Sequence, residues 1–370
     1  MKQTITYSAG IIFSLVLLFL IPQIAKAEIV PLTKGTTPEI AYFPNRPNHI
    51  SDNANNALMT TDSTQISQES ATDITLQNFT LQYNPTLSKF NYLLNPTNFY
   101  QDNLLNIGMI TKTETSAGYK AATKKALKTN IKISNMTFNA NNVGTSIINI
   151  AKAKNISIQK TQLLNSGLQS GISLTYSDNV TLANNRLKNL GRIGIVMYYG
   201  NSGITISNNQ VIDWMQRYGS YHYDAVKKSG ETLDSMQDAA IDSYGPANQY
   251  ITVKNNLINL SAGANKVNPN NPLIAKKWRL KTVPNYTRYT ALRASGAQYA
   301  LYQGNTINID SPDTFAFFTT NMRKSNTLTR PKAIVLTGNS FTSRNIDYPI
   351  RIFAGISDTA LLTILFAVPI

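Results

Sequence analysis

The residues of this sequence best suited to chemistry are Asp242 and Arg293, because they fall at the same position in two successive copies of an internal repeat. A carboxylate and a guanidinium in neighbouring repeats could move a proton and neutralise a negative group, and Tyr198, Tyr244 and His222 could exchange a proton with a substrate. We therefore expect these five residues to form a catalytic centre. The competing interpretation is a surface ion pair between Asp242 and Arg293, which would contribute only about 0 to 1 kcal/mol to stability.

Abstraction of the C5 proton of a uronic acid is the reaction that this set fits best. Arg293 would neutralise the C6 carboxylate of the sugar, and His222 or one of the tyrosines would act as the base. A tyrosine with its ordinary pKa near 10 is a poor base unless neighbouring cations lower that pKa. A lyase is our first expectation and an epimerase our second.

Glycoside hydrolysis is a weaker alternative, because it needs two carboxyl groups about 5 to 9.5 Å apart. Asp238 and Asp242 would lie roughly 13 Å apart in an extended strand, although Asp224 or Asp234 could supply the second group from a loop. A protein that only binds a glycan, or that belongs to the cell envelope, is a further alternative. We expect no metal and no other cofactor, since the site offers only Asp242 as a calcium ligand and the chain has two distant histidines and no cysteine.

Two segments rich in aromatic and basic side chains would form a substrate-binding wall beside this centre. They are insertions in two successive repeats, near residues 213–238 and 262–290, and each holds one of the two tryptophans. Aromatic rings stack on the apolar faces of sugars, and arginine and lysine bind uronate carboxylates. Alternatively, the rings only pack the insertions onto the body of the protein. With one arginine from a later repeat, the expected substrate-binding residues are Trp214, Arg217, Tyr218, Tyr221, Lys227, Trp278, Arg279 and Arg351.

A repeated phrase must position all of these residues. It has the form apolar-x-apolar-x-(Asn/Gly)-Asn-x-apolar, and clear copies begin at Val180, Ile204, Ile251 and Ile334. The alternating apolar residues are typical of a short strand, and the Asn pair is typical of a turn with left-handed backbone. A period of about 24 residues indicates one coil of a parallel β-helix. A leucine-rich repeat has a similar period, but its Leu-x-x-Leu-x-Leu phrase is missing here.

A second strand in each coil decides which side chains face outward. Alternate residues of a strand point to opposite faces, so Asp242 and Arg293 point outward if Ile241 and Leu292 point inward. A register shift of one residue would turn Asp242 and Arg293 into the core and remove the site. The aligned inward positions are Ile172, Ile195, Ile241, Leu292 and Ile350.

From about Ile74 to Phe353 the sequence resembles the pectate-lyase-like superfamily, through its Asn-Asn turn phrases and its Gly-Ile-x-apolar strands. The resemblance implies an all-β protein, a single-stranded right-handed parallel β-helix with two long loop insertions. The superfamily includes polysaccharide lyases and epimerases, glycoside hydrolases and phage tailspikes, so the fold does not select one activity. The sequence lacks the Asn-Thr-Asp, Asp-Asp and His-Gly blocks of polygalacturonases, so it does not have their full set with Arg-x-Lys, and it lacks the Asp-Pro-His-Asp block of periplasmic alginate epimerases.

The N-terminal residues have the pattern of an export signal. Lys2 is followed by an apolar stretch and by Ala25-Lys26-Ala27, which is typical of signal peptide cleavage. We therefore expect a periplasmic or secreted protein with no transmembrane span after cleavage. The expected organisation is a signal peptide at 1–27, an irregular arm or cap at 28–70, the β-helix at 71–358 and an apolar tail at 359–370.

The chain is strongly basic, with 34 Lys and Arg against 19 Asp and Glu and a net charge of +15. Such an excess attracts polyanions. For an exported protein, an acidic polysaccharide is a more natural partner than nucleic acid, although a basic surface can also serve solubility alone. The sequence does not fix the sugar, the linkage or the oligomeric state.

Overall fold

The computed structural model describes part of the chain. The described residues are 29–32, 49–50, 58–61, 64–66, 75–83, 103–107, 128–142, 146–167, 169–216, 238–261, 290–309, 315–319, 322–324, 327–342, 350–352 and 363–365. The expected signal peptide, the insertions from residue 217 to 237 and from 262 to 289, and most of the apolar tail lie outside these ranges. Within the described part, no helix has the length and apolar character needed to cross a membrane.

Three parallel sheets contain nearly all the described strands. Sheet A consists of β1 (Ile29–Leu32), β3 (Leu58–Thr61), β6 (Thr80–Tyr83), β9 (Thr137–Asn139), β12 (Gln162–Leu164), β15 (Arg186–Lys188), β18 (Gln210–Ile212), β21 (Leu257–Leu260), β24 (Thr306–Ile309) and β29 (Ser340–Thr342). Sheet B consists of β2 (His49–Ile50), β5 (Thr75–Gln77), β8 (Lys128–Ser134), β11 (Ala153–Gln159), β14 (Asp178–Ala183), β17 (Ser202–Ser207), β20 (Gln249–Lys254), β23 (Gln298–Gln303), β28 (Lys332–Thr337) and β31 (Thr363–Leu365).

Sheet C consists of β4 (Thr64–Ile66), β7 (Leu105–Ile107), β10 (Ile148–Ala151), β13 (Ile172–Thr175), β16 (Ile195–Met197), β19 (Ala239–Tyr244), β22 (Thr290–Ser295), β25 (Phe315–Thr319) and β30 (Ile350–Ile352). The antiparallel hairpin β26 (Met322–Lys324) and β27 (Thr327–Thr329) stands apart from the three sheets.

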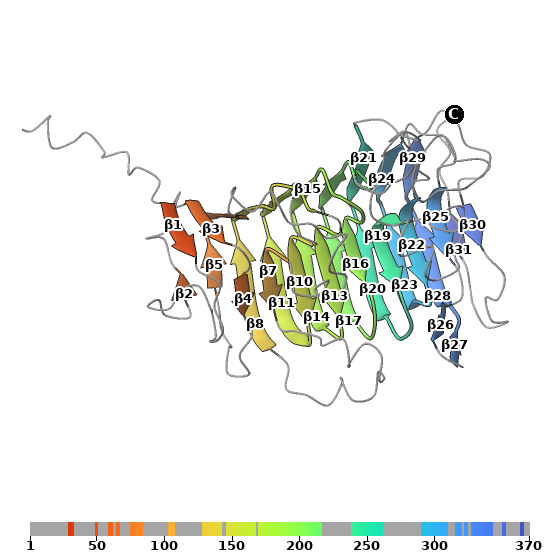
Figure 1. The fold of residues 1–370 in the computed structure, drawn as a ribbon. Coiled ribbons are helices and arrows are strands. Elements are labelled where there is room, and N and C mark those ends of the chain that lie inside the picture. The colour runs from red at the N-terminus through yellow and green to blue at the C-terminus, as the bar shows by residue number, and fades with distance from the viewer. Residues whose placement is uncertain are drawn as a thin grey trace, which may run out of the picture.

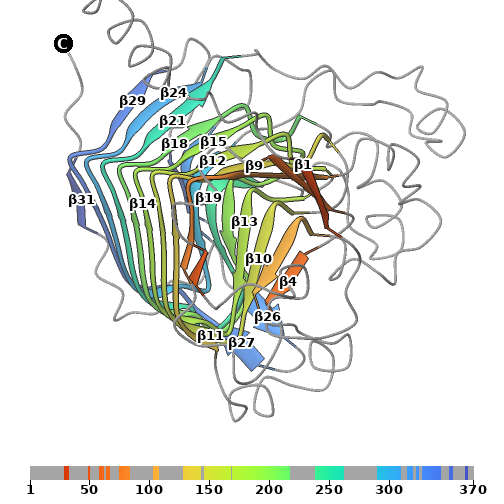
Figure 2. The same ribbon diagram turned by 90° about the vertical axis from the view of Figure 1, so that its left-hand side faces the viewer.

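Each coil of the chain visits the three sheets in the same order. β11, β12 and β13 belong to sheets B, A and C, and β14, β15 and β16 repeat that order one coil later. Figure 1 shows the coils stacked from the red N-terminal strands to the blue C-terminal strands, and Figure 2, seen along the stack, shows the sheets enclosing a common interior. The fold is a parallel β-helix, as the repeat predicted.

The interior is filled by aligned columns of apolar side chains. In sheet B the first residues of the repeated phrase pair coil by coil, so that Ile156, Val180, Ile204 and Ile251 lie in one column of the hydrophobic core. The coils approach closely where a Gly-Ile phrase enters sheet C. A Cβ atom on Gly194 would lie 2.3 Å from the carbonyl oxygen of the next coil, which is why glycine occupies this position.

The two members of the Asn pair have different roles. The first takes the left-handed backbone conformation that turns the chain from sheet B into sheet A, with φ of 55° at Asn208 and 54° at Asn255. The second is buried and forms a ladder, in which the amide of Asn209 donates to Oδ1 of Asn256 at 3.0 Å and that of Asn256 to Oδ1 of Asn305 at 2.9 Å. The ladder satisfies polar groups that the turns would otherwise bury without partners.

Candidate functional site

The outer face of sheet C carries the candidate catalytic pair. β19 pairs with β22 so that Asp242 lies opposite Arg293 and Ile241 opposite Leu292. Ile241 and Leu292 belong to the hydrophobic core, so Asp242 and Arg293 lie on the other face of the sheet, as predicted. We call the column of residues at this position the outer column of sheet C; it runs through Asn106, Asn149, Ser173, Val196, Asp242, Arg293 and Phe318.

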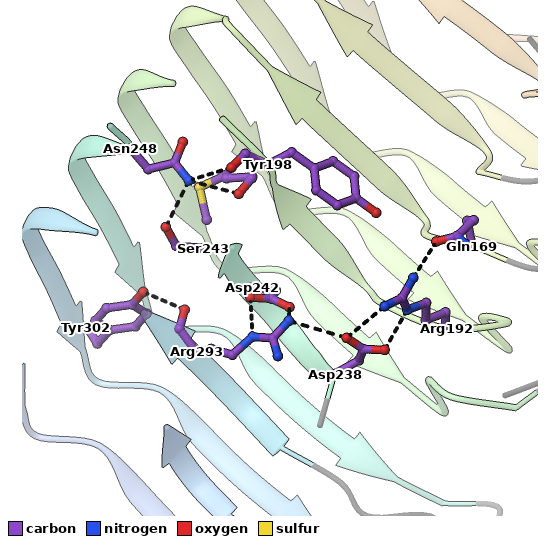
Figure 3. A network of polar contacts seen from close by, with 10 residues as sticks. Gln169, Arg192, Tyr198, Asp238, Asp242, Ser243, Asn248, Arg293 and Tyr302 are labelled. Carbon is purple, nitrogen blue, oxygen red and sulfur yellow. Dashed lines mark hydrogen bonds and ion pairs between the residues drawn. The ribbon is translucent and has the colours of Figure 1, made fainter. Parts of the chain in front are cut away.

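A chain of charged contacts crosses several coils at this face (Figure 3). Nε of Arg293 donates to Oδ1 of Asp242 at 2.7 Å, and Nη2 of Arg293 contacts Oδ2 of the same residue. Nη2 also contacts Oδ1 of Asp238 at 3.3 Å. The other cation, Arg192, donates through Nε to Oδ2 of Asp238 at 2.5 Å and through Nη1 to Gln169 at 3.3 Å. Two carboxylates and two guanidinium groups therefore form one network.

The network is buried, which corrects the interpretation of Asp242 and Arg293 as a surface ion pair. Asp242 is 0% exposed and Arg293 6%. Burial has the largest effect on Asp242 and raises the pKa of its carboxyl above the ordinary 3.8, although Arg293 opposes this rise. For Arg293, burial lowers the pKa, but Asp242 and Asp238 outweigh it, so its pKa is raised and the guanidinium stays charged.

Aromatic side chains surround Arg293. The ring of Tyr244 lies under its guanidinium, with 4.7 Å from Cζ to the ring centroid, and Tyr198 packs edge-on against Tyr244 at 6.4 Å. On the core side, the hydroxyl of Tyr302 donates to the backbone carbonyl of Arg293 at 3.1 Å (Figure 3). Burial, with a smaller effect of Asp242, raises the pKa of Tyr302, so this hydroxyl remains a donor. The prediction that Tyr198, Tyr244, Asp242 and Arg293 lie together is confirmed.

The carboxylates of Asp238 and Asp242 lie closer together than expected, because an oxygen of each contacts Nη2 of Arg293. The estimate of roughly 13 Å assumed one extended strand, but β19 begins at Ala239, after Asp238. The long side chain of Arg293 reaches both carboxylates from the next coil, with the same nitrogen. The principal argument against a paired-carboxylate site is thereby removed.

Sequence reasoning missed Arg192 and Gln169 as members of this network. Gln169, Arg192 and Asp238 each lie three residues before the inward residues Ile172, Ile195 and Ile241, which pair coil by coil in sheet C. The alignment that placed Asp242 beside Arg293 would also have placed these three residues in a column, had it been extended toward the start of each strand.

The structure corrects one expected substrate-binding residue, Trp214, and the alignment of another, Arg351. Trp214 precedes the first insertion and is fully buried in the hydrophobic core, so its ring cannot stack on a sugar. Arg351 was aligned directly after Arg293, but β25 supplies an additional coil in which Phe318 pairs with both arginines. This coil has its own copy of the phrase, Ala300 to Ile307, but the alignment of inward positions did not include its strand in sheet C, Phe315–Thr319.

The other residues of the expected site lie outside the described ranges. They are His222, Arg217, Tyr218, Tyr221, Lys227, Trp278 and Arg279. Among the residues that the structure does describe, no three histidine, aspartate or glutamate side chains are grouped so as to hold a metal ion.

Comparison with known proteins shows the fold. The family model described as the right handed beta helix region matches residues 46–226. No curated protein matches the chain. Similar solved structures include the catalytic domain of a GH87 alpha-1,3-glucanase in complex with nigerose, with 10% identity, a TM-score of 0.41 and coverage of 92% of this chain and 63% of that one.

Two further structures have a similar degree of likeness. Geobacillus virus E2 ORF18 has 8% identity, a TM-score of 0.39 and coverage of 94% of this chain and 63% of its own. The A-module of the Azotobacter vinelandii mannuronan C-5 epimerase AlgE6 has 12% identity, a TM-score of 0.29 and coverage of 84% and 85%. The chain thus spans less than two thirds of the glucanase and viral chains, and these likenesses carry no argument about this protein. The coil order and the family model identify a right-handed parallel β-helix.

Proposed function

We propose that this protein is a carbohydrate-active enzyme that acts on an acidic polysaccharide at the outer face of sheet C. The observation that carries the proposal is the pair of carboxylates, Asp238 and Asp242, on one nitrogen of Arg293. The stacking of the coils does not require charged residues at this position, because the neighbouring coils have Val196 and Phe318 in the same outer column. The net charge of +15 favours an acidic substrate.

Glycoside hydrolysis is the reaction that the carboxylate pair supports best. Asp242 is suited to be the general acid, because burial raises the pKa of its carboxyl and favours the protonated form. Asp238 is suited to be the nucleophile or base, because Arg192 and Arg293 both stabilise its anion. In this scheme Asp242 gives its proton to the glycosidic oxygen, Asp238 attacks the anomeric carbon or activates water, and water restores both groups. Because Asp242 is 0% and Asp238 3% exposed, this face must open to the substrate and the Asp242–Arg293 pair must separate before the two carboxyl groups can react.

Abstraction of the C5 proton is the second candidate, as a lyase or an epimerase. It is favoured by the cation beside the tyrosines, since the guanidinium of Arg293 lies 4.7 Å from the ring of Tyr244 and could help to neutralise a uronate carboxylate. Tyr244 or Tyr198 would then exchange the proton with the sugar. Against this reaction, Arg293 already contacts two carboxylates.

One assay separates these reactions. The purified protein is incubated with polygalacturonate, alginate and a neutral α-glucan, and both new reducing ends and the ultraviolet absorbance of unsaturated products are followed. Hydrolysis gives reducing ends alone, and a lyase gives both signals. We expect new reducing ends from an acidic polymer, and a loss of activity of about 100-fold or more in Asp242→Asn. Wild-type activity should decline as the pH rises through the pKa of Asp242, which is raised above 3.8, because the general acid must be protonated.

The control is Gln210→Ala, which truncates an exposed polar side chain on β18 of sheet A, away from sheets B and C. It should retain full activity. Full activity of a correctly folded Asp242→Asn would exclude the assignment of Asp242, and the absence of either product, with retained affinity for the polymer, would leave a glycan-binding protein instead. We further propose that residues 1–27 direct export to the periplasm or the medium, which fractionation of cells expressing the full chain would test.

A further inference from the structure

Two exposed tyrosines stack on the outer face of sheet B, away from the carboxylate network. Tyr250 is 57% exposed and Tyr299 40%, and these are the large apolar side chains that the described surface presents most openly. Their ring centroids lie 5.3 Å apart with an interplanar angle of 10°, and Nζ of Lys332 lies 5.3 Å from the ring centroid of Tyr299. The pair forms a flat aromatic surface with a cation at one end.

The backbone at these tyrosines is one that large side chains rarely adopt. φ is 55° at Tyr250 and 54° at Tyr299, in the left-handed region. The strand pairing of sheet B places Asn155, Asn179 and Gly203 at the equivalent position of the three preceding coils and Ala333, with φ of 51°, at that of the following coil. Asparagine and glycine tolerate this conformation best. Backbone stability would therefore favour asparagine at both positions, so the tyrosines point to a function.

A polar groove continues the same columns toward the N-terminus. It has a volume of about 490 Å³ and includes Asn130, Asn155 and Asn179, together with the next outward column, Lys132, Ser157 and Thr181. The asparagine side chains are linked, since the amide of Asn179 donates to Oδ1 of Asn155 at 2.7 Å. The groove and the tyrosine pair thus lie along one face, in corresponding positions of successive coils.

The chemistry of this face matches an acidic sugar chain. Amide and hydroxyl groups bind sugar hydroxyls, aromatic rings stack on the apolar faces of pyranose rings, and lysines attract carboxylates. Lys132, Lys154, Lys254 and Lys332 lie on the strands of sheet B, with Asp178 paired to Lys154. The columns repeat once per coil, about every 4.8 Å, which is close to the length of one sugar residue in an extended glycan.

We propose that the outer face of sheet B is a second, non-catalytic binding surface for an acidic polysaccharide, with Tyr250 and Tyr299 as its stacking platform. A long substrate could be held on this face while sheet C acts on another part of it. The inference concerns binding alone and does not depend on which reaction, if any, sheet C performs.

The test replaces both tyrosines with asparagine. Tyr250→Asn/Tyr299→Asn installs the residue that other coils use at this position, so the variant should fold with an unchanged or higher melting temperature. Binding to polygalacturonate and to alginate is measured by calorimetry, in a background that carries Asp242→Val and Arg293→Phe to remove the charged pair of sheet C. We expect affinity for at least one polymer to fall by roughly tenfold or more.

Tyr250→Phe/Tyr299→Phe is the matched control, because it keeps the stacked rings, and it should bind within about threefold of its parent. Equal affinity of the asparagine variant and its parent would overturn the proposal, as would a parent that binds neither polymer. Because binding is measured without turnover, failure of the proposed reaction would leave this result unchanged, and failure of the tyrosine platform would leave the effect of Asp242→Asn on activity unchanged.

Discussion

At the scale of single residues, burial of the Asp242–Arg293 pair in sheet C costs more free energy of desolvation than burial of the apolar residues beside it. Asp242 and Arg293 are buried between Val196 and Phe318 in the outer column. These two apolar residues occupy the same sheet and need no partner of opposite charge. A buried ion pair is often no more stabilising than apolar residues of similar size. The pair is therefore better explained by function than by stability.

This explanation predicts different effects of single and double substitutions. Arg293→Phe leaves Asp242 buried without its cation and should lower the free energy of unfolding by about 3 to 5 kcal/mol. Asp242→Val/Arg293→Phe extends the apolar column and should restore most of that loss while it abolishes activity. Chemical denaturation monitored by circular dichroism measures both effects. A double variant as unstable as Arg293→Phe would show that the pair has a structural role that apolar residues cannot replace.

At the scale of elements, the turns from sheet B into sheet A depend on the buried asparagine ladder. The amide of Asn256 donates to the carbonyl of Ile206 at 3.0 Å and to Oδ1 of Asn305 at 2.9 Å, and its Oδ1 accepts from the backbone N–H of Asn209 at 2.9 Å. One side chain thus connects three successive coils.

Asn256→Leu should therefore be strongly destabilising although leucine has a similar volume. It leaves buried donors and acceptors in the adjoining coils without partners, each of which costs about 1 to 3 kcal/mol, so we expect a loss of roughly 3 kcal/mol or more. Gln210→Ala, at an exposed position of the neighbouring strand β18, should change stability by about 0.5 kcal/mol or less. A loss for Asn256→Leu no larger than for Gln210→Ala would show that the ladder contributes nothing to stability.

At the scale of the whole molecule, stability is a sum of contacts between neighbouring coils. The chain has no cysteine, so no disulfide links one coil to another. A coil in the middle of the stack has two neighbours, whereas a terminal coil has one, which makes the centre the more stable part of a solenoid. The core column from Ile156 to Ile251 lies in this central part.

Amide hydrogen exchange should follow that gradient. We expect the slowest exchange in β11, β14, β17 and β20, and the fastest among the strands in β1 and β31, because opening begins at the ends of the stack. Mass spectrometry of peptic fragments measures the rates. Equal protection along the stack would instead indicate that all coils open in one cooperative step.

The sequence by itself determined the coil and the neighbours of a residue within a column. Alternation of apolar residues and the Asn pair are local properties of each repeat, and their spacing sets which residues of successive coils pair. That was enough to predict the parallel β-helix and to place Asp242 opposite Arg293. It did not reveal β25, because Phe315–Thr319 lacks the Gly-Ile-x-apolar pattern that marks the sheet C strands β13 and β16.

Only the tertiary structure decided which side chains meet between columns and which are buried. Arg293 reaches Asp238 because a long side chain spans from one coil to the start of the preceding strand, and strand periodicity carries no information about such diagonal contacts. Trp214 lies in the core because the chain is still completing its coil at that residue, before the insertion begins. The position of a residue in a column follows from the local repeat. The burial of a side chain, and the residues of other columns that it contacts, depend on how whole coils stack and where each strand starts.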